Sequence, residues 1–266
     1  MRKLKNLLLI INLQTFIISF LATTSTAICI YFKYEADFPL TIITMSIVFP
    51  IVFSIGGAYK RREAALREYA AIKGYLRSIY FVSRDWNPKS KKINAKKAIF
   101  LIEDLFNNIR LMFTNSNVEI NKYESKLYGN FSDLSKFINI DLKESGLSLG
   151  ECSRINQYLQ KLLISFESIK HIYQYRTPRT LKAFSSLFIF IIPIIYGPYF
   201  AFQAENMSYG LEYVTPILLT MILVSLKNIQ EHLENPFDQV GLDDVKFNVK
   251  KFIENLKISE GVLDKE

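Results

Sequence analysis

The chain has few of the residues that build disulfide and metal sites: two cysteines and two histidines among 266 residues. Two cysteines cannot make a disulfide framework, and Cys29 and Cys152 are expected in different compartments as small buried side chains. His171 and His232 are far apart in the sequence, and neither lies in a recognisable ligand spacing. A metal or catalytic site at His232, with two glutamates close by, is conceivable but less favoured. With no glycine-rich phosphate loop either, the sequence predicts neither an enzyme nor a cofactor.

Charge is scarce in four long apolar runs, which cover residues 6–32, 39–58, 183–202 and 211–229. A helix that crosses a bilayer needs about 20 mostly apolar residues. Each central Leu, Ile, Phe or Val favours insertion by about 0.3–0.6 kcal/mol. The first run is about twice as long as the apolar part of a signal peptide, so we expect it to be a retained transmembrane helix. The sequence therefore predicts an all-α, polytopic membrane protein with four transmembrane helices.

The formal net charge is +8, and the basic residues are unevenly placed. They precede the first and third runs and follow the second and fourth, whereas both short connectors are acidic or neutral. By the positive-inside rule, both termini and the long middle segment are expected in the cytoplasm of a multi-pass cell-membrane protein. The excess charge is thus interpreted as topology and contact with membrane lipids, and nucleic acid is not expected as a partner.

This topology divides the chain into four regions. Residues 1–58 hold transmembrane helices 1 and 2, and 59–180 form a helical cytoplasmic region. Residues 181–230 hold transmembrane helices 3 and 4, and 231–266 form a cytoplasmic tail. Within the cytoplasmic region, apolar residues recur at three- and four-residue steps in three segments, at 66–76, 99–113 and 155–169. The second transmembrane helix is predicted to continue unbroken through 58–73, and loops are expected near 87–88 and 115–117.

Three stretches carry specific patterns: FSIGGAYKRREA (53–64), YRTPRTLKAF (175–184) and HLENPFDQVGLDDVKF (232–247). In this order they resemble segments of the bestrophin family of pentameric ion channels. The first resembles the end of the family's second helix, where Tyr59 and Arg61 match in place but Ser54 and Gly56 replace the usual Arg and Asn. The second resembles the Thr-Pro motif that opens helix three, with Pro178 in place.

The third stretch resembles the family's segment directly after helix four and contains the most distinctive residues: Asn235, Pro236 and Phe237. We expect Pro236 to end the helix, Phe237 to pack and Asn235 to cap the turn. In animal members the following acidic residues form part of a calcium clasp. Here Val240 stands where an acidic ligand is expected, and Asp238, Asp243 and Asp244 offer too few oxygens for calcium. We therefore predict no metal site and no calcium regulation.

The resemblance implies a homopentameric ring with one axial pore lined by helix two. Met45, Phe49 and Phe53 fall on one stripe of that helix, and the family's pore neck maps onto them. A ring of such stripes makes an apolar constriction that gates by dewetting. The alternative is that the stripe simply packs against neighbours or lipid. Pro50, which lacks a donor, is expected to kink the helix.

Arg179 follows Thr177-Pro178, where the family usually places a small apolar residue at a second, cytoplasmic aperture. A ring of Arg179 side chains attracts anions and repels cations. The alternative is that Arg179 flanks the membrane and reaches headgroups or acidic neighbours. The function predicted is a channel for small inorganic ions, chloride or other anions above all. Its rival is a non-conducting, membrane-anchored helical scaffold that binds a partner.

Overall fold

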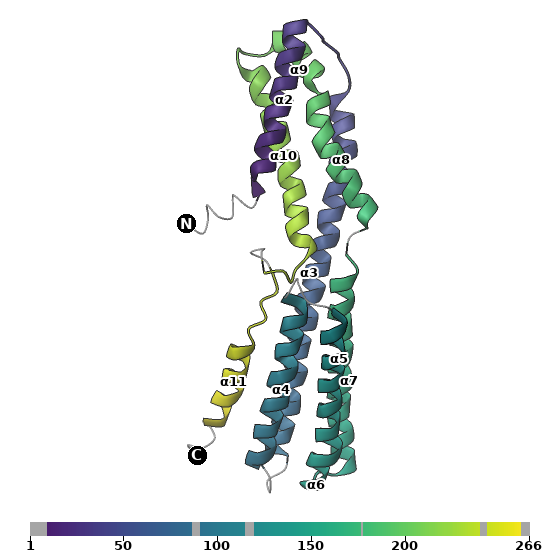
Figure 1. Ribbon diagram of the computed structural model, residues 1–266, viewed down its shortest axis with the longest axis vertical. Helices are drawn as coiled ribbons and strands as arrows, with labels where there is room; N and C mark the ends of the chain where they lie inside the picture. The colour runs from purple at the N-terminus through teal and green to yellow at the C-terminus, as the bar shows by residue number, and fades with distance from the viewer. Residues whose placement is uncertain (1–9, 87–90, 115–119, 177, 240–243, 262–266) are drawn as a thin grey trace. The chain divides into compact units, whose positions relative to one another are not determined.

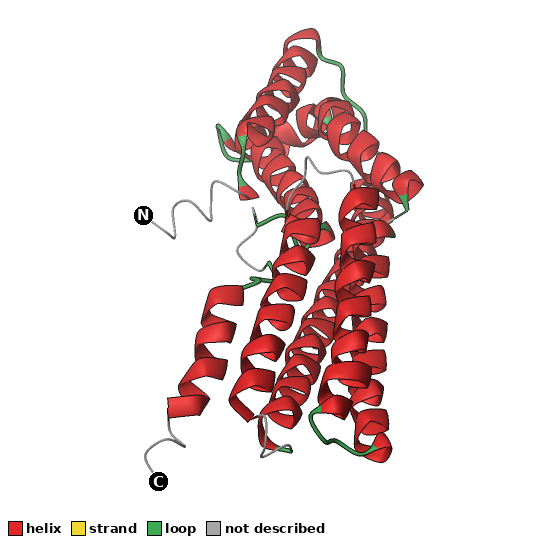
Figure 2. Cartoon of the chain, turned by 60° about the horizontal axis from the view of Figure 1, so that its bottom comes forward, coloured by secondary structure: helices red, strands yellow, loops and turns green. Residues whose placement is uncertain are grey.

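A computed structural model describes residues 10–86, 91–114, 120–176, 178–239 and 244–261. These residues form helices and connecting loops, with no strand among them (Figure 1, Figure 2). The predicted all-α class is therefore confirmed. The chain divides into two compact units. The first unit comprises Met1–Arg61 and Arg176–Asn235, and the second comprises Arg62–Tyr175 and Pro236–Glu266.

The first unit contains the apolar helices. They are α2 (Leu13–Phe32), the first part of α3 (Leu40–Asp85), α8 (Arg179–Ile195), α9 (Gly197–Gln203) and α10 (Leu211–Glu234). Within the described residues, four helical segments are long and apolar enough to cross a membrane, as predicted, and α8, α9 and the following turn count as one of them. Helix α2 lies along α10, and both contact α8 and α9 (Figure 1).

The N-terminal end of α2 lies further along the chain than the apolar run indicates. The run begins at residue 6, whereas α2 begins at Leu13. Asn12 caps the start of α2. Its side chain accepts a hydrogen bond from the Thr15 backbone, and the Thr15 hydroxyl accepts one from the Asn12 backbone. Such a capping box satisfies two backbone donors at a helix start. The expected start at residue 6 lies outside the described residues, and apolar composition alone does not mark a cap.

The third apolar run, predicted as one helix over 183–202, is broken between Ile195 and Gly197. Pro198 has no backbone donor, so it cannot bond the carbonyl of Ile194 four residues earlier. The Ser25 hydroxyl of α2 donates to that carbonyl at 2.7 Å instead. Gly197 lies directly against Ser25: a methyl group at Gly197 would meet the Ser25 hydroxyl and come within 3.0 Å of the Ser25 backbone carbonyl carbon. The single-helix expectation is therefore corrected to two helices.

The second unit is a bundle of amphipathic helices. It contains the rest of α3, α4 (Lys91–Thr114), α5 (Ile120–Lys136), α6 (Leu142–Glu144), α7 (Leu149–Gln174) and α11 (Val249–Gly261), with a π-turn at Phe137–Asp141. Helix α4 contacts α5 and α11, and α5 contacts α7. Aromatic side chains fill much of the core: Phe106 packs edge-on against Phe252, and Phe113 stacks on Phe247.

Most helices of the second unit agree with the periodicity of the sequence. The segments predicted at 66–76, 99–113 and 155–169 lie in α3, α4 and α7, and α3 is unbroken over 46 residues. Helices α5 and α11 are additional. Their sequences signal them weakly, because α5 is polar with a central glycine and α11 has only 13 residues. The loops expected at 87–88 and 115–117 also lie outside the described residues.

Candidate functional site

The apolar stripe of α3 is exposed on the surface of the chain. Met45, Phe49 and Phe53 are 64%, 62% and 65% exposed, and the Phe49 and Phe53 rings meet edge to face with centroids 4.6 Å apart. The opposite face of the helix is buried: Ile47 and Ile51 belong to the core of the first unit. Helix α3 thus presents three large apolar side chains that the described part of the chain does not cover.

Polar contacts hold α3 in this rotation. On its buried side, the Ser54 hydroxyl accepts a hydrogen bond of 2.7 Å from the Gln230 amide of α10. Nearer the N-terminal end of α3, the hydroxyl groups of Thr44 and Tyr196 share a hydrogen bond of 3.2 Å. Hydrogen bonds between buried side chains specify orientation because a rotated helix leaves them unpaired. The two contacts therefore fix which face of α3 points outward.

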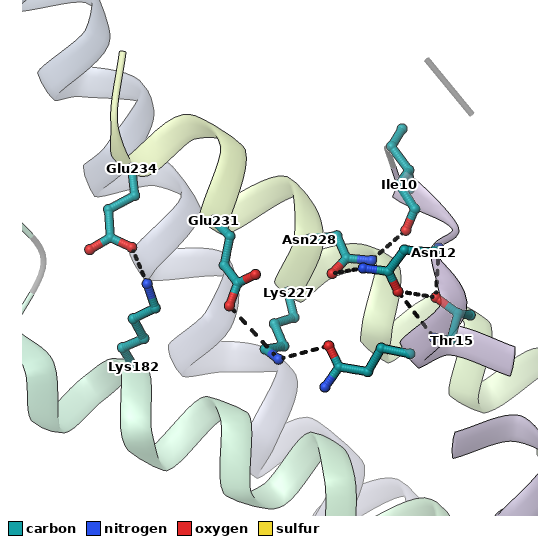
Figure 3. A network of polar contacts seen from close by, with 9 residues as sticks. Ile10, Asn12, Thr15, Lys182, Lys227, Asn228, Glu231 and Glu234 are labelled. Atoms are coloured by element: carbon teal, nitrogen blue, oxygen red, sulfur yellow. Dashed lines mark hydrogen bonds and ion pairs between the residues drawn. The ribbon is translucent and has the colours of Figure 1, made fainter. Parts of the chain in front are cut away.

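The last two turns of α10 form a polar strip that binds other helices of the first unit (Figure 3). Asn228 accepts a hydrogen bond from Asn12 at 3.3 Å and donates to the Ile10 carbonyl at 2.6 Å. The Lys227 ammonium lies 3.3 Å from the Gln14 amide oxygen and 3.8 Å from Glu231. Lys227, Asn228 and Gln230 are all buried. The strip ties α10 to the start of α2.

The same strip reaches α8 through Glu234. The Lys182 ammonium lies 2.9 Å from the Glu234 carboxylate, which is almost fully buried (Figure 3). The charge of Glu234 also acts on the Arg61 guanidinium of α3. Glu231 and Glu234, the neighbours of His232, are therefore both engaged by lysines. These carboxylates serve packing here, and among the described residues no group of three or more His, Cys, Asp or Glu side chains is placed to hold a metal.

The sequence analysis did not identify this strip. By sequence, Lys227 is one of the basic residues that follow the fourth apolar run, and Glu231 and Glu234 are the two glutamates close to His232. A signal was present: the segment KNIQEHLE (227–234) continues the helix with polar residues at positions where α10 faces other helices. Recognising it required knowing which face is buried, and this depends on partners far away in the sequence.

Comparisons with known proteins identify the fold. No protein-family model matches the chain, and no curated protein matches it in sequence. Crystal structures of a bacterial bestrophin homolog from Klebsiella pneumoniae, each with one substitution, match it in structure. One has a TM-score of 0.76 at 14% identity and covers 93% of this chain and 99% of that one. A second has a TM-score of 0.76 at 13% identity and covers 93% of this chain and 97% of that one. A third has a TM-score of 0.73 at 14% identity and covers 97% of this chain and 98% of that one.

The chain has the bestrophin fold. The match extends over nearly the whole length of both chains, so the order of elements indicated by the three sequence motifs is confirmed. Together with the four apolar helices, it describes a multi-pass membrane protein. At identities this low the likeness shows the fold, and the residues that line a pore must be inferred from this chain itself.

The three bestrophin-like stretches all lie at boundaries between the two units of the chain. Each contains one of the points at which the chain passes between its two units: Arg61–Arg62, Tyr175–Arg176 and Asn235–Pro236.

The Thr-Pro stretch opens α8. Pro178 occupies the N-cap position without a side-chain hydrogen bond, and Arg179 is the first residue of the helix. Thr177 and the side chain of Arg179 lie outside the described residues, so the aperture expected at Arg179 stays a prediction. Tyr59, in the first stretch, is half exposed on α3.

The Asn-Pro-Phe stretch follows α10 directly. Asn235 ends the helix in extended backbone, and the Pro236 carbonyl accepts a hydrogen bond of 2.7 Å from the Val245 backbone. Phe237 is fully buried and stacks on Phe113 with centroids 5.3 Å apart. Phe237 thus joins the aromatic core of the second unit. Val240 and Asp243 lie outside the described residues, and the expected lack of calcium regulation stays a prediction.

Proposed function

We propose that the chain is the subunit of a homopentameric, bestrophin-like ion channel whose α3 helices line a central pore. The observation that carries the proposal is the outward stripe of Met45, Phe49 and Phe53 on a helix whose other face is buried. The bestrophin-like fold supports it, because the family resemblance assigns the pore neck to these three positions. Around a ring, three successive layers of apolar side chains form the neck.

Such a neck controls flux through its wetting. A narrow pore lined by phenylalanine and methionine loses its water column, and an ion then cannot pass without shedding its hydration shell. Small changes in the radius or polarity of the neck restore the water and the conductance. The Phe49–Phe53 contact couples neighbouring layers, so the two rings are expected to move together.

The permeant species proposed are small anions, chloride among them. The basis is the excess of positive charge and the Arg179 position at the start of α8, which the resemblance places at the cytoplasmic aperture. In this proposal residues 59–180 and 231–266 and both termini lie in the cytoplasm, and lipids surround the outer helices. No catalytic step is part of the mechanism.

Purified protein in planar bilayers tests the proposal. We expect chloride currents from the natural chain, and a several-fold increase in open-channel current on Phe49→Ala or Phe53→Ala, since alanine widens the neck and favours its wetting. Phe20→Ala on α2 is the matched control, because Phe20 is similarly exposed, at 72%, on a helix outside the proposed pore. An absence of conductance, or equal effects of the three substitutions, would contradict the proposal.

Subunit number is an independent check. Native mass spectrometry of the detergent-solubilised protein is expected to give a pentamer. A monomer or dimer would instead favour the non-conducting scaffold, in which the stripe contacts lipid or a partner helix.

A further inference from the structure

The second unit contains a small basic pocket between α3 and the start of α11. Its volume is about 270 Å³, and four cations line it: Lys73, Arg77, Lys246 and Lys251. Lys73 and Arg77 come from α3, whereas Lys246 and Lys251 come from the segment that leads into and begins α11. No acidic side chain is among the lining residues that the structure describes.

The charge of this pocket is not neutralised by the described part of the protein. None of the four cations forms an ion pair with a described residue. Elsewhere in the same unit Lys170 shows the usual arrangement, with carboxylates of Glu124 and Glu167 at 2.9 and 2.7 Å. Burial, together with the positive charge of Arg77, lowers the pKa of Lys73. Like charges gathered without counterions destabilise a fold, so an anion bound here would stabilise it.

Two of the four cations, Lys73 and Arg77, are held in place before any ligand arrives. The Lys73 ammonium lies 4.5 Å from the centre of the Tyr69 ring, and the Arg77 guanidinium lies 5.2 Å from that of Phe252. The Tyr69 hydroxyl donates to the Lys246 carbonyl at 3.1 Å, which ties the later segment to α3. Cation–π contacts and this hydrogen bond limit the movement of the charges, so less entropy is lost when a ligand binds.

We propose that this pocket binds a small multivalent oxyanion, such as an inorganic di- or triphosphate or the phosphorylated headgroup of a lipid. Four cations match several negative charges better than one, and Lys and Arg donors suit phosphate oxygens. The volume is below the range of about 300–1,000 Å³ typical of drug-sized ligands, which favours a compact phosphate group. The pocket belongs to the second unit and the proposed neck to the first, and binding at the pocket does not depend on conductance.

Calorimetry of the full-length protein in lipid nanodiscs, titrated with inorganic tripolyphosphate, tests the proposal. We expect saturable binding that weakens at high salt. The double substitution Lys73→Gln with Lys251→Gln is expected to raise the Kd at least about tenfold, a loss of about 1.4 kcal/mol. The matched control is Lys96→Gln with Lys161→Gln, which removes the same charge from exposed positions outside the pocket and should leave the Kd unchanged.

The source of the phosphate is separated by a second titration. If nanodiscs that contain a phosphorylated inositol lipid bind tripolyphosphate more weakly, and only in the natural chain, the headgroup is the ligand; if they do not, it is a soluble phosphate. Lys251→Gln alone gives the same readout should the double variant fold poorly. Absence of tripolyphosphate binding in plain nanodiscs, or equal weakening by both double variants, overturns the proposal.

Discussion

At the level of single residues, Gln230 illustrates how a polar side chain serves the membrane unit. Its amide nitrogen donates to Ser54, while its oxygen is buried without a hydrogen-bond partner among the described residues. Ser54 stands where the bestrophin pattern has arginine. An arginine at that position would bring a long charged side chain to a site that now holds a short hydroxyl against Gln230. The serine at position 54, which departs from the family pattern, therefore matches the buried Gln230 amide that donates to it.

Substituting Ser54 tests this pairing. Ser54→Ala removes the acceptor and leaves a buried amide unpaired, which is expected to lower stability by about 1–3 kcal/mol. The double substitution Ser54→Ala with Gln230→Leu removes both polar partners and should recover much of the loss. Thermal unfolding of the solubilised protein measures both. If the double variant loses as much stability as Ser54→Ala and Gln230→Leu lose separately, added together, the two residues are not coupled.

At the level of elements, the helices are shaped by where glycine and proline fall. Pro198 ends the hydrogen bonding of α8, and the neighbouring Gly197 allows the backbone to approach Ser25 of α2. Gly74, in the middle of α3, has open space where a methyl group would lie. One glycine is thus required by a close contact, whereas the other only makes its helix less stable.

Alanine at these two positions is expected to act in opposite directions. Gly74→Ala should stabilise α3 by about 0.5–1 kcal/mol, because alanine loses less backbone freedom in a helix than glycine does. Gly197→Ala should destabilise the protein, by about 1–3 kcal/mol, because the added methyl group meets Ser25. Thermal midpoints of the two variants, compared with the natural chain, check both signs. A stabilising Gly197→Ala would show that α2 and α9 are not tightly packed.

At the level of the whole molecule, the proposed pore exists only in the assembly. A single chain exposes Met45, Phe49 and Phe53, and their role as a neck follows only if several copies turn them toward one axis. The same holds for Arg179, whose charge acts on permeating ions only when copies of it surround a common path. In the proposed channel, selectivity is thus a property of the ring and of its symmetry.

Reversing that charge tests the aperture. Arg179→Glu converts a ring of guanidinium groups into a ring of carboxylates, which attracts cations instead of anions. Under a potassium chloride gradient the reversal potential is expected to change sign. Arg154→Glu, on the exposed face of α7, makes the same change of charge away from the proposed aperture and should leave the reversal potential where it was. If both variants behave alike, Arg179 does not line the pathway.

Several features followed from the sequence because their causes are local. The length and low charge of four segments determined the membrane-crossing helices, since insertion depends on composition over about 20 residues. Periodic apolar residues determined α4 and α7, and Ser148 at the start of α7 is a local cap. The three bestrophin-like stretches indicated the fold that the structural comparison then showed.

The tertiary structure decided what depends on distant partners. Ser25 completes the hydrogen bonding where α8 ends, Ser54 meets Gln230, and Tyr69 is joined to Lys246 across a long stretch of chain. None of these pairs is implied by local periodicity, because a hydrogen bond between helices depends on which faces meet when the chain folds. The physical reason is that insertion and helix formation are determined over a few turns, whereas buried polar pairs and the basic pocket require long-range packing.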